Sequence, residues 1–97
     1  MARILVSDPI DDAGVQQLVN AGHQVDVKTG MAPDELVAAI GDYDALIVRS
    51  ETKVTPAVFD KAARLQVVGR AGVGVDNIDI DAATQHGVAV VNAPTGN

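Results

Sequence analysis

The chain has 97 residues, of which 47% are hydrophobic and 21% are charged, as in one small folded domain rather than a disordered segment. The net charge of −6 and the 2% of aromatic residues argue against a nucleic-acid surface, which needs clustered cations and stacking rings. The sequence contains no cysteine, which excludes disulfide scaffolds and cysteine nucleophiles. No apolar run could span a bilayer, and Asp8 comes too early for a signal peptide, so we expect a cytoplasmic protein without membrane contact.

Short β-branched runs alternate with amphipathic helical segments at a spacing of about 20 residues, which is typical of βα units. Continuous apolar runs indicate strands covered on both faces, whereas Val25 and Val27 alternate with polar residues, as on an edge strand with one wet face. Right-handed crossovers from that edge predict an α/β fold, a flavodoxin-like doubly wound parallel five-stranded sheet of order 2-1-3-4-5. The predicted strands are Arg3–Ser7, Gln24–Lys28, Ala45–Arg49, Gln66–Arg70 and Val88–Asn92.

Four segments between the strands carry apolar residues at helical spacing together with terminal signals such as Pro33, Thr55 and Gly22. We expect the fourth helix to begin at Asp79 or Asp81. A complete doubly wound sheet has a helix after its fifth strand, whereas this sequence stops at Asn97. We therefore expect that helix to be missing and an apolar face to be exposed. The residues predicted to point inward are Val15, Leu18 and Val19, then Leu36, Val37 and Ile40, then Val58, Phe59 and Ala62, and finally Ile80 and Ala83.

The residues best suited to chemistry follow the strands, because ligands of doubly wound sheets bind beyond the carboxyl ends of the strands. Successive N–H groups of a glycine turn can converge on an anion, and a guanidinium pairs with carboxylate or phosphate. Glycines can also relieve crowding in a tight turn, and arginines can form surface ion pairs, so these alternatives stay open. Two arginines at neighbouring strand ends favour an anion site. Its candidate residues are Arg49 and Ser50 after the third strand, and Arg70, Gly72, Val73 and Gly74 after the fourth.

Other ligand motifs do not fit. The run from Gly72 to Asn77 imitates a dinucleotide fingerprint, but Asn77 stands where the fingerprint has its third glycine. No acidic residue follows about 20 residues later. The P-loop sequence is absent, and the first strand is followed by Asp8 and Pro9, which are typical of a turn rather than of a flavin-phosphate loop. The third strand ends without the aspartate of a phospho-acceptor site. Neither histidine has a partner at metal-ligand spacing, so no metal site is predicted.

Three stretches resemble the D-2-hydroxyacid dehydrogenase family. They are Val48-Arg49-Ser50, the run from Gly69 to Asp79, and Val90 to Pro94 with Gly96-Asn97. The resemblance covers the whole chain in order, and the glycine-rich run is close to diagnostic for the family. Within the family, Arg49 together with Arg70 points to the enzymes that act on a phosphorylated substrate, 3-phosphoglycerate.

The resemblance implies a parent oxidoreductase that converts 3-phosphoglycerate to 3-phosphohydroxypyruvate with NAD, in serine biosynthesis. It implies that Arg49, Ser50 and Arg70 bind the substrate. Gly72, in the turn Gly72-Val73-Gly74 that follows Arg70, belongs to the same substrate-binding set. The backbone N–H groups of Val73 and Gly74 would bind the substrate carboxylate. The residues that the resemblance places near the cofactor are Val73, beside the nicotinamide, and Asn97, at the crossing into the cofactor domain.

Residues 1–97 are therefore interpreted as a truncated substrate-binding lobe without the Rossmann cofactor domain, which in the family supplies the catalytic arginine, glutamate and histidine. We expect no catalytic residue and no bound cofactor in the isolated chain, and hence no activity. The alternative is a structural half-domain that binds no ligand and self-associates, as a dimer or by element exchange, to cover its apolar face. A third interpretation is an unrelated flavodoxin-like binding protein.

Overall fold

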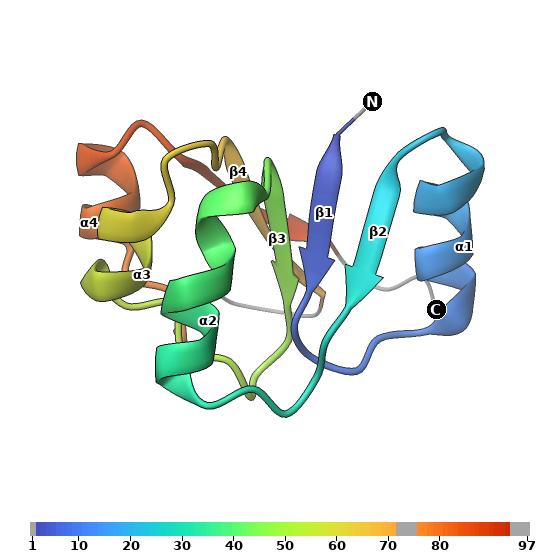
Figure 1. Cartoon of the computed structure of the whole chain (residues 1–97), viewed down its shortest axis with the longest axis horizontal. Coiled ribbons are helices and arrows are strands. Elements are labelled where there is room, and N and C mark those ends of the chain that lie inside the picture. The colour runs from blue at the N-terminus through green and yellow to red at the C-terminus, as the bar shows by residue number, and fades with distance from the viewer. Residues whose placement is uncertain (1, 72–75, 94–97) are drawn as a thin grey trace.

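A computed structural model describes residues 2–71 and 76–93, in which strands and helices alternate along the chain (Figure 1). In this part of the chain, no helix combines the length and the apolar character needed to cross a membrane. The strands are β1 (Arg3–Val6), β2 (Gln24–Val27), β3 (Ala45–Val48), β4 (Val67–Ala71) and β5 (Ala89–Ala93). The helices are α1 (Asp12–Asn20), α2 (Pro33–Ala39), α3 (Pro56–Lys61) and α4 (Ile80–Gln85), with a 3-10 turn η1 (Ile40–Asp42) after α2.

The five strands form one parallel sheet in the order β2-β1-β3-β4-β5, which confirms the predicted topology. In the register of this sheet, Val48 of β3 lies opposite Arg70 of β4, and Arg70 lies opposite Asn92 of β5. The carboxyl ends of these three strands are therefore level. Residues that follow them along the chain begin at the same edge of the sheet.

The hydrophobic core lies between the sheet and helices α2, α3 and α4, which gather on one side of the molecule, while α1 stands beside β2 (Figure 1). Leu5, Leu46 and Val68 are fully buried and come from three different strands, and Phe59 of α3 packs in the same cluster. Burying a side chain of this size contributes about 1.5–3 kcal/mol. The core therefore fixes the central strands most firmly.

Two helices bury less than predicted. Val19 of α1 is 45% exposed and no residue of α1 is buried, because α1 packs against the edge strand β2 rather than over the sheet centre. In α4 the predicted inward residue Ile80 is 41% exposed, whereas Ala82 and Ala83 are buried. Ile80 occupies the first helical position, outside the close contact that the small alanines make. The inward positions predicted for α2 and α3 are confirmed for Leu36, Ile40, Val58, Phe59 and Ala62.

The face of β3, β4 and β5 opposite the core is partly open. Alternation along a strand places Ile47, Val67 and Val91 on the face opposite the buried Leu46 and Val68. Ile47 and Val67 are partly exposed, and Val91 is 46% exposed. The predicted exposed apolar face is therefore present on this part of the sheet.

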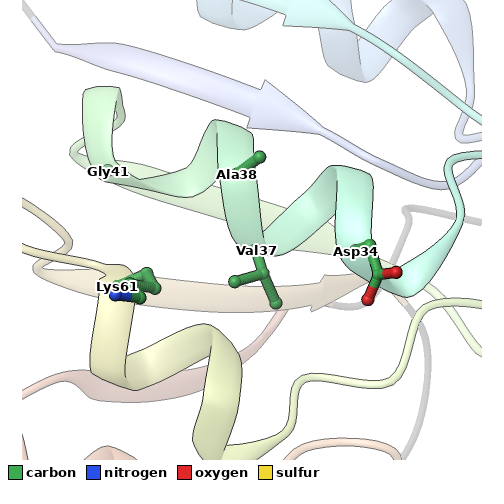
Figure 2. A pocket seen from close by; sticks show the side chains of 5 residues that line it. All are labelled: Asp34, Val37, Ala38, Gly41 and Lys61. Carbon is green, nitrogen blue, oxygen red and sulfur yellow. The ribbon is translucent and has the colours of Figure 1, made fainter.

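Gly41 lets η1 approach α3 closely. A Cβ atom at this position would lie 3.1 Å from the carbonyl oxygen of Lys61, which is tighter than an ordinary contact. Beside it is a surface hollow of about 390 Å³ between α2 and α3 (Figure 2). Among the described residues its lining contains none of Arg49, Ser50 and Arg70, and consists of Asp34, Val37, Ala38, Gly41 and Lys61.

Asp44, just before β3, joins three strands at the amino-terminal edge of the sheet. Its Oδ2 accepts a hydrogen bond from the N–H of Arg3 at 2.9 Å, and its carbonyl oxygen accepts one from the N–H of Gln66 at 2.8 Å. The N–H of Arg3, together with the guanidinium of Arg64 at 3.4 Å, holds the pKa of the Asp44 carboxyl below its usual range. This carboxylate thus has a structural role far from the carboxyl ends of the strands.

Asp26, the third of the four residues of β2, lies on the predicted wet face, and its side chain is 30% exposed. Its carboxylate accepts a hydrogen bond of 2.6 Å from the Tyr43 hydroxyl and lies 3.9 Å from the guanidinium of Arg3. The Arg3 guanidinium in turn lies 5.1 Å from the centroid of the Tyr43 ring. Val27 is 54% exposed and Gln24 is exposed as well, so the edge position of β2 is confirmed, and both of its faces are partly open where one wet face was predicted. Burial and the hydrogen bond to Asp26 raise the pKa of Tyr43 to about 12.

The raised pKa of Tyr43 predicts a loss of stability at alkaline pH. The folded protein holds the phenol proton more tightly than the unfolded chain, where the pKa is about 10. The stabilisation is complete below about pH 10 and is lost as the pH rises through about 12. In Tyr43→Phe we expect about 1 kcal/mol lower stability at neutral pH, because the hydrogen bond is lost, and a shallower decline between these pH values. Urea unfolding followed by circular dichroism measures both, and parallel declines in the two proteins would contradict the prediction.

Candidate functional site

The structure brings Arg49, Ser50 and Arg70 to one edge of the sheet. Because Val48 and Arg70 are opposite each other in the register, Arg49 follows β3 directly beside the end of β4. Arg49 and Ser50 are exposed, and Arg70 is partly buried. The adjacent strand ends on which the anion-site hypothesis depends are therefore present. The other predicted site residues, Gly72, Val73, Gly74 and Asn97, lie outside the described residues.

The buried carboxylate of Asp8 holds the backbone that carries Arg49 and Ser50. Asp8 is 2% exposed, and its Oδ2 accepts hydrogen bonds from the N–H of Arg49 at 2.7 Å and of Thr52 at 2.9 Å. Its Oδ1 accepts a third from the Thr52 hydroxyl at 2.5 Å. A buried carboxylate needs such donors, because an uncompensated charge in the interior is costly. Asp8 is thus an internal acceptor as well as a residue of the loop that follows β1.

Asn77 holds the same backbone from its carbonyl side. The Asn77 side chain is 8% exposed, and its Nδ2 donates to the carbonyl oxygens of Arg49 and Thr52, both at 2.6 Å. Next to it, Val54 and Ile78 form a parallel bridge, in which the N–H of Val54 donates to the Asn77 carbonyl at 2.9 Å. The segment after β3 is therefore tied to the segment before α4.

The described residues between β4 and α4 do not fit a dinucleotide. In the dinucleotide fingerprint, the third glycine allows close packing of helix and strand. Here that position is Asn77, whose buried side chain is bonded to the loop after β3. Helix α4 has six residues, and the predicted cap Asp79 accepts a hydrogen bond from the N–H of Ala82 at 2.9 Å.

A hollow of about 680 Å³ lies next to the site, at the carboxyl ends of β1, β2 and β3. Asp8 and Thr52 line it on the side of the site, and Met31, Leu36 and Val58 form its apolar wall. Neither Arg49 nor Arg70 is among its lining residues. The hollow therefore borders the loop that carries Arg49 and Ser50, on the side of Asp8 and Thr52.

The histidines are not at the site. His23 Nδ1 accepts a hydrogen bond from the N–H of Ala2 at 3.1 Å, and His86 at the end of α4 lies 3.2 Å from the carboxylate of Asp60. Over residues 2–71 and 76–93, no group of three or more His, Asp or Glu side chains could hold a metal ion.

Sequence reasoning missed Asp8, Thr52 and Asn77 as parts of the site. Asp8 was interpreted as a turn residue and Asn77 as a defect in a glycine motif. One available signal was that an aspartate directly after a buried central strand begins at the ligand edge of the sheet. The hydrogen-bond partners were not available from sequence, because Asp8 is 41 residues from Arg49 and 44 residues from Thr52.

Comparison with known proteins gives consistent matches. A family model described as the catalytic domain of D-isomer specific 2-hydroxyacid dehydrogenases matches residues 4–97. The D-3-phosphoglycerate dehydrogenase of Archaeoglobus fulgidus is 50% identical over 95 residues, which are 98% of this chain and 18% of that protein. The Bacillus subtilis D-3-phosphoglycerate dehydrogenase is 52% identical over 97 residues, 100% of this chain and again 18% of the relative.

The fold is also shared with solved structures. The NAD-bound 3-phosphoglycerate dehydrogenase of Entamoeba histolytica matches with a TM-score of 0.86 and 31% identity, over 96% of this chain and 33% of that one. The chain therefore corresponds to a minor part of the length of each of these proteins.

Proposed function

Because the chain belongs to the D-isomer-specific 2-hydroxyacid dehydrogenase family, we propose that it forms the anion-binding part of the substrate lobe of an NAD-dependent 3-phosphoglycerate dehydrogenase. The observation that carries the proposal is the placement of Arg49 beside the end of β4, where Arg70 lies. Two guanidinium groups at one edge suit a substrate with a carboxylate and a phosphate. Two relatives of 50% and 52% identity are D-3-phosphoglycerate dehydrogenases, which supports this substrate.

In this proposal Arg49, Ser50 and Arg70 bind the substrate through their side chains. The family resemblance adds the backbone of Gly72, Val73 and Gly74 as carboxylate ligands, and places Val73 and Asn97 near the cofactor. The parent enzyme would oxidise 3-phosphoglycerate to 3-phosphohydroxypyruvate in serine biosynthesis, in the cytoplasm, with NAD accepting the hydride. The described residues of this chain contribute substrate binding alone.

The substrate proposal predicts selective binding of 3-phosphoglycerate. In a two-dimensional amide NMR titration we expect saturable shifts at Arg49, Ser50, Arg70 and residues 72–74, beyond those caused by inorganic phosphate at matched ionic strength. Arg49→Gln and Arg70→Gln should each weaken affinity by about tenfold or more, since a hydrogen bond to a charged group contributes about 1.5–3 kcal/mol.

Arg64→Gln is the matched control, because Arg64 pairs with Asp44 at the opposite edge of the sheet. The affinity of this variant for 3-phosphoglycerate should equal that of the wild-type chain. A well-folded spectrum without shifts at these residues would show that the chain alone does not bind the substrate. Equal losses in all three variants would mean that net charge, rather than a built site, governs binding.

The isolated chain is expected to form no NADH from 3-phosphoglycerate and NAD. Hydride transfer needs a held nicotinamide and a base, which the family resemblance assigns to parts of the parent enzyme that are not among these 97 residues. An NADH absorbance assay with the purified chain measures this directly. Sustained NADH formation that tracks the chain through purification would contradict the expectation.

The partly open sheet face favours a second function, self-association of a structural half-domain as a dimer or by element exchange. A face with Ile47, Val67 and the 46% exposed Val91 gains free energy when it is covered. We expect the mass measured by light scattering to rise with concentration, and Val91→Lys to suppress the rise. Val19→Lys on α1, where Val19 is 45% exposed, is the control and should leave it unchanged. A monomer mass at all concentrations would contradict self-association.

A further inference from the structure

We propose that Asp8 and Asn77 are positioning residues, which bind the N–H groups and the carbonyl groups, respectively, of Arg49 and Thr52 and so set where Arg49 and Ser50 meet the substrate. The part about the substrate rests on the proposed function. The part about the backbone rests on hydrogen bonds alone. We refer to Asp8 and Asn77, with the four backbone groups that they bind, as the loop clamp.

The loop clamp is complementary in polarity. Asp8 offers a carboxylate, which only accepts hydrogen bonds, and it binds the N–H groups of Arg49 and Thr52 at 2.7 and 2.9 Å. Asn77 uses its amide nitrogen, which donates, and it binds the carbonyl oxygens of the same two residues at 2.6 Å each. Both polar backbone groups of Arg49 and of Thr52 are therefore occupied by side chains. Little backbone rotation is possible without breaking at least one of these bonds.

Burial indicates that the clamp acts within the protein rather than on a ligand. Asp8 is 2% and Asn77 is 8% exposed, whereas Arg49, whose backbone they bind, and the next residue, Ser50, are exposed. The Thr52 hydroxyl, held by Asp8, also lies 3.0 Å from the hydroxyl of Ser7. Fixed backbone beneath exposed side chains is the arrangement that preorganises a binding residue.

The clamp also joins the two segments of the proposed anion site. Asn77 belongs to the stretch that follows Arg70 and the glycine run, and Arg49 belongs to the stretch that follows β3. The Val54–Ile78 bridge continues the connection, with the N–H of Asp79 donating to the Val54 carbonyl at 2.9 Å. A change at Asn77 should therefore disturb Arg49, although 28 residues separate them in sequence.

The test compares Asp8→Ala and Asn77→Leu with the wild-type chain and with Asp44→Ala. Asp44 is a matched control, because its carboxylate also accepts a backbone N–H bond, from Arg3 at 2.9 Å, but at the amino-terminal edge. Two quantities are measured by NMR: hydrogen exchange of the Arg49 and Thr52 amides without ligand, and the Kd for 3-phosphoglycerate. Unshifted amide signals of Leu46 and Val68 establish that each variant keeps its core.

We expect both clamp variants to exchange the Arg49 and Thr52 amides faster and to bind 3-phosphoglycerate about tenfold to a hundredfold more weakly. Asp8→Asn, which keeps an acceptor oxygen, should recover part of the loss, and Asp44→Ala should change neither quantity. If Asp8→Ala does not fold, Asp8→Asn and Thr52→Val provide the comparison. Thr52→Val removes the hydroxyl that donates to Asp8 and contacts Ser7, and it keeps the backbone N–H that also binds Asp8.

A purely structural role would lower stability but leave the Kd of the folded protein unchanged, and that result would overturn the proposal. So would an equal loss of affinity in Asp44→Ala. If the wild-type chain does not bind 3-phosphoglycerate, the proposed function of the isolated chain fails. Amide exchange then decides on the clamp, and unchanged exchange in Asp8→Ala and Asn77→Leu would overturn it.

Discussion

The level register of the parallel strands is the constraint on which the candidate site depends. Parallel pairing places the carboxyl ends of β1, β3 and β4 at one edge, and the N–H of Ser7 still donates to the carbonyl of Ile47 at 3.0 Å just beyond β1. Asp8 is thereby delivered to the backbone of Arg49. A slip of one residue in this pairing would reverse the faces of the strand and remove Asp8 from its donors. The apolar core that fixes the register thus also fixes the polar contacts at the edge.

Carboxylates at both edges of the sheet accept hydrogen bonds from backbone N–H groups, but they differ in how they affect the neighbouring arginine. At the amino-terminal edge, the Asp44 carboxylate accepts a hydrogen bond from the N–H of Arg3 and pairs with the exposed guanidinium of Arg64. At the carboxyl edge, Asp8 binds the backbone and leaves the adjacent Arg49 exposed. Acidic residues satisfied by neutral N–H groups do not compete for the arginines as surface carboxylates would. An acidic chain can in this way present a local site for an anion.

Sequence patterns predicted the elements, their order and the strand ends that carry Arg49 and Arg70, because hydrophobic periodicity and strand connectivity are local properties. They did not predict which apolar residues stay exposed, as Val19, Val27 and Ile80 show, since burial depends on what packs opposite. They also missed Asp8 and Asn77, whose roles depend on partners 25 to 44 residues away along the chain. Local motifs predicted an anion site at these strand ends. Only the folded chain showed which side chains bind the backbone there.

The position of Tyr43 decides what optical spectroscopy can report about this protein. The sequence has one tyrosine and no tryptophan, so near-ultraviolet absorbance and emission come almost entirely from a single phenol. That phenol is hydrogen-bonded to Asp26 of β2, whereas Arg49 and Arg70 lie at the carboxyl ends of β3 and β4. An optical melting curve therefore follows the loss of structure around β2 and the start of β3. We expect ligand binding at Arg49 and Arg70 to change this signal little, so the two events can be observed separately.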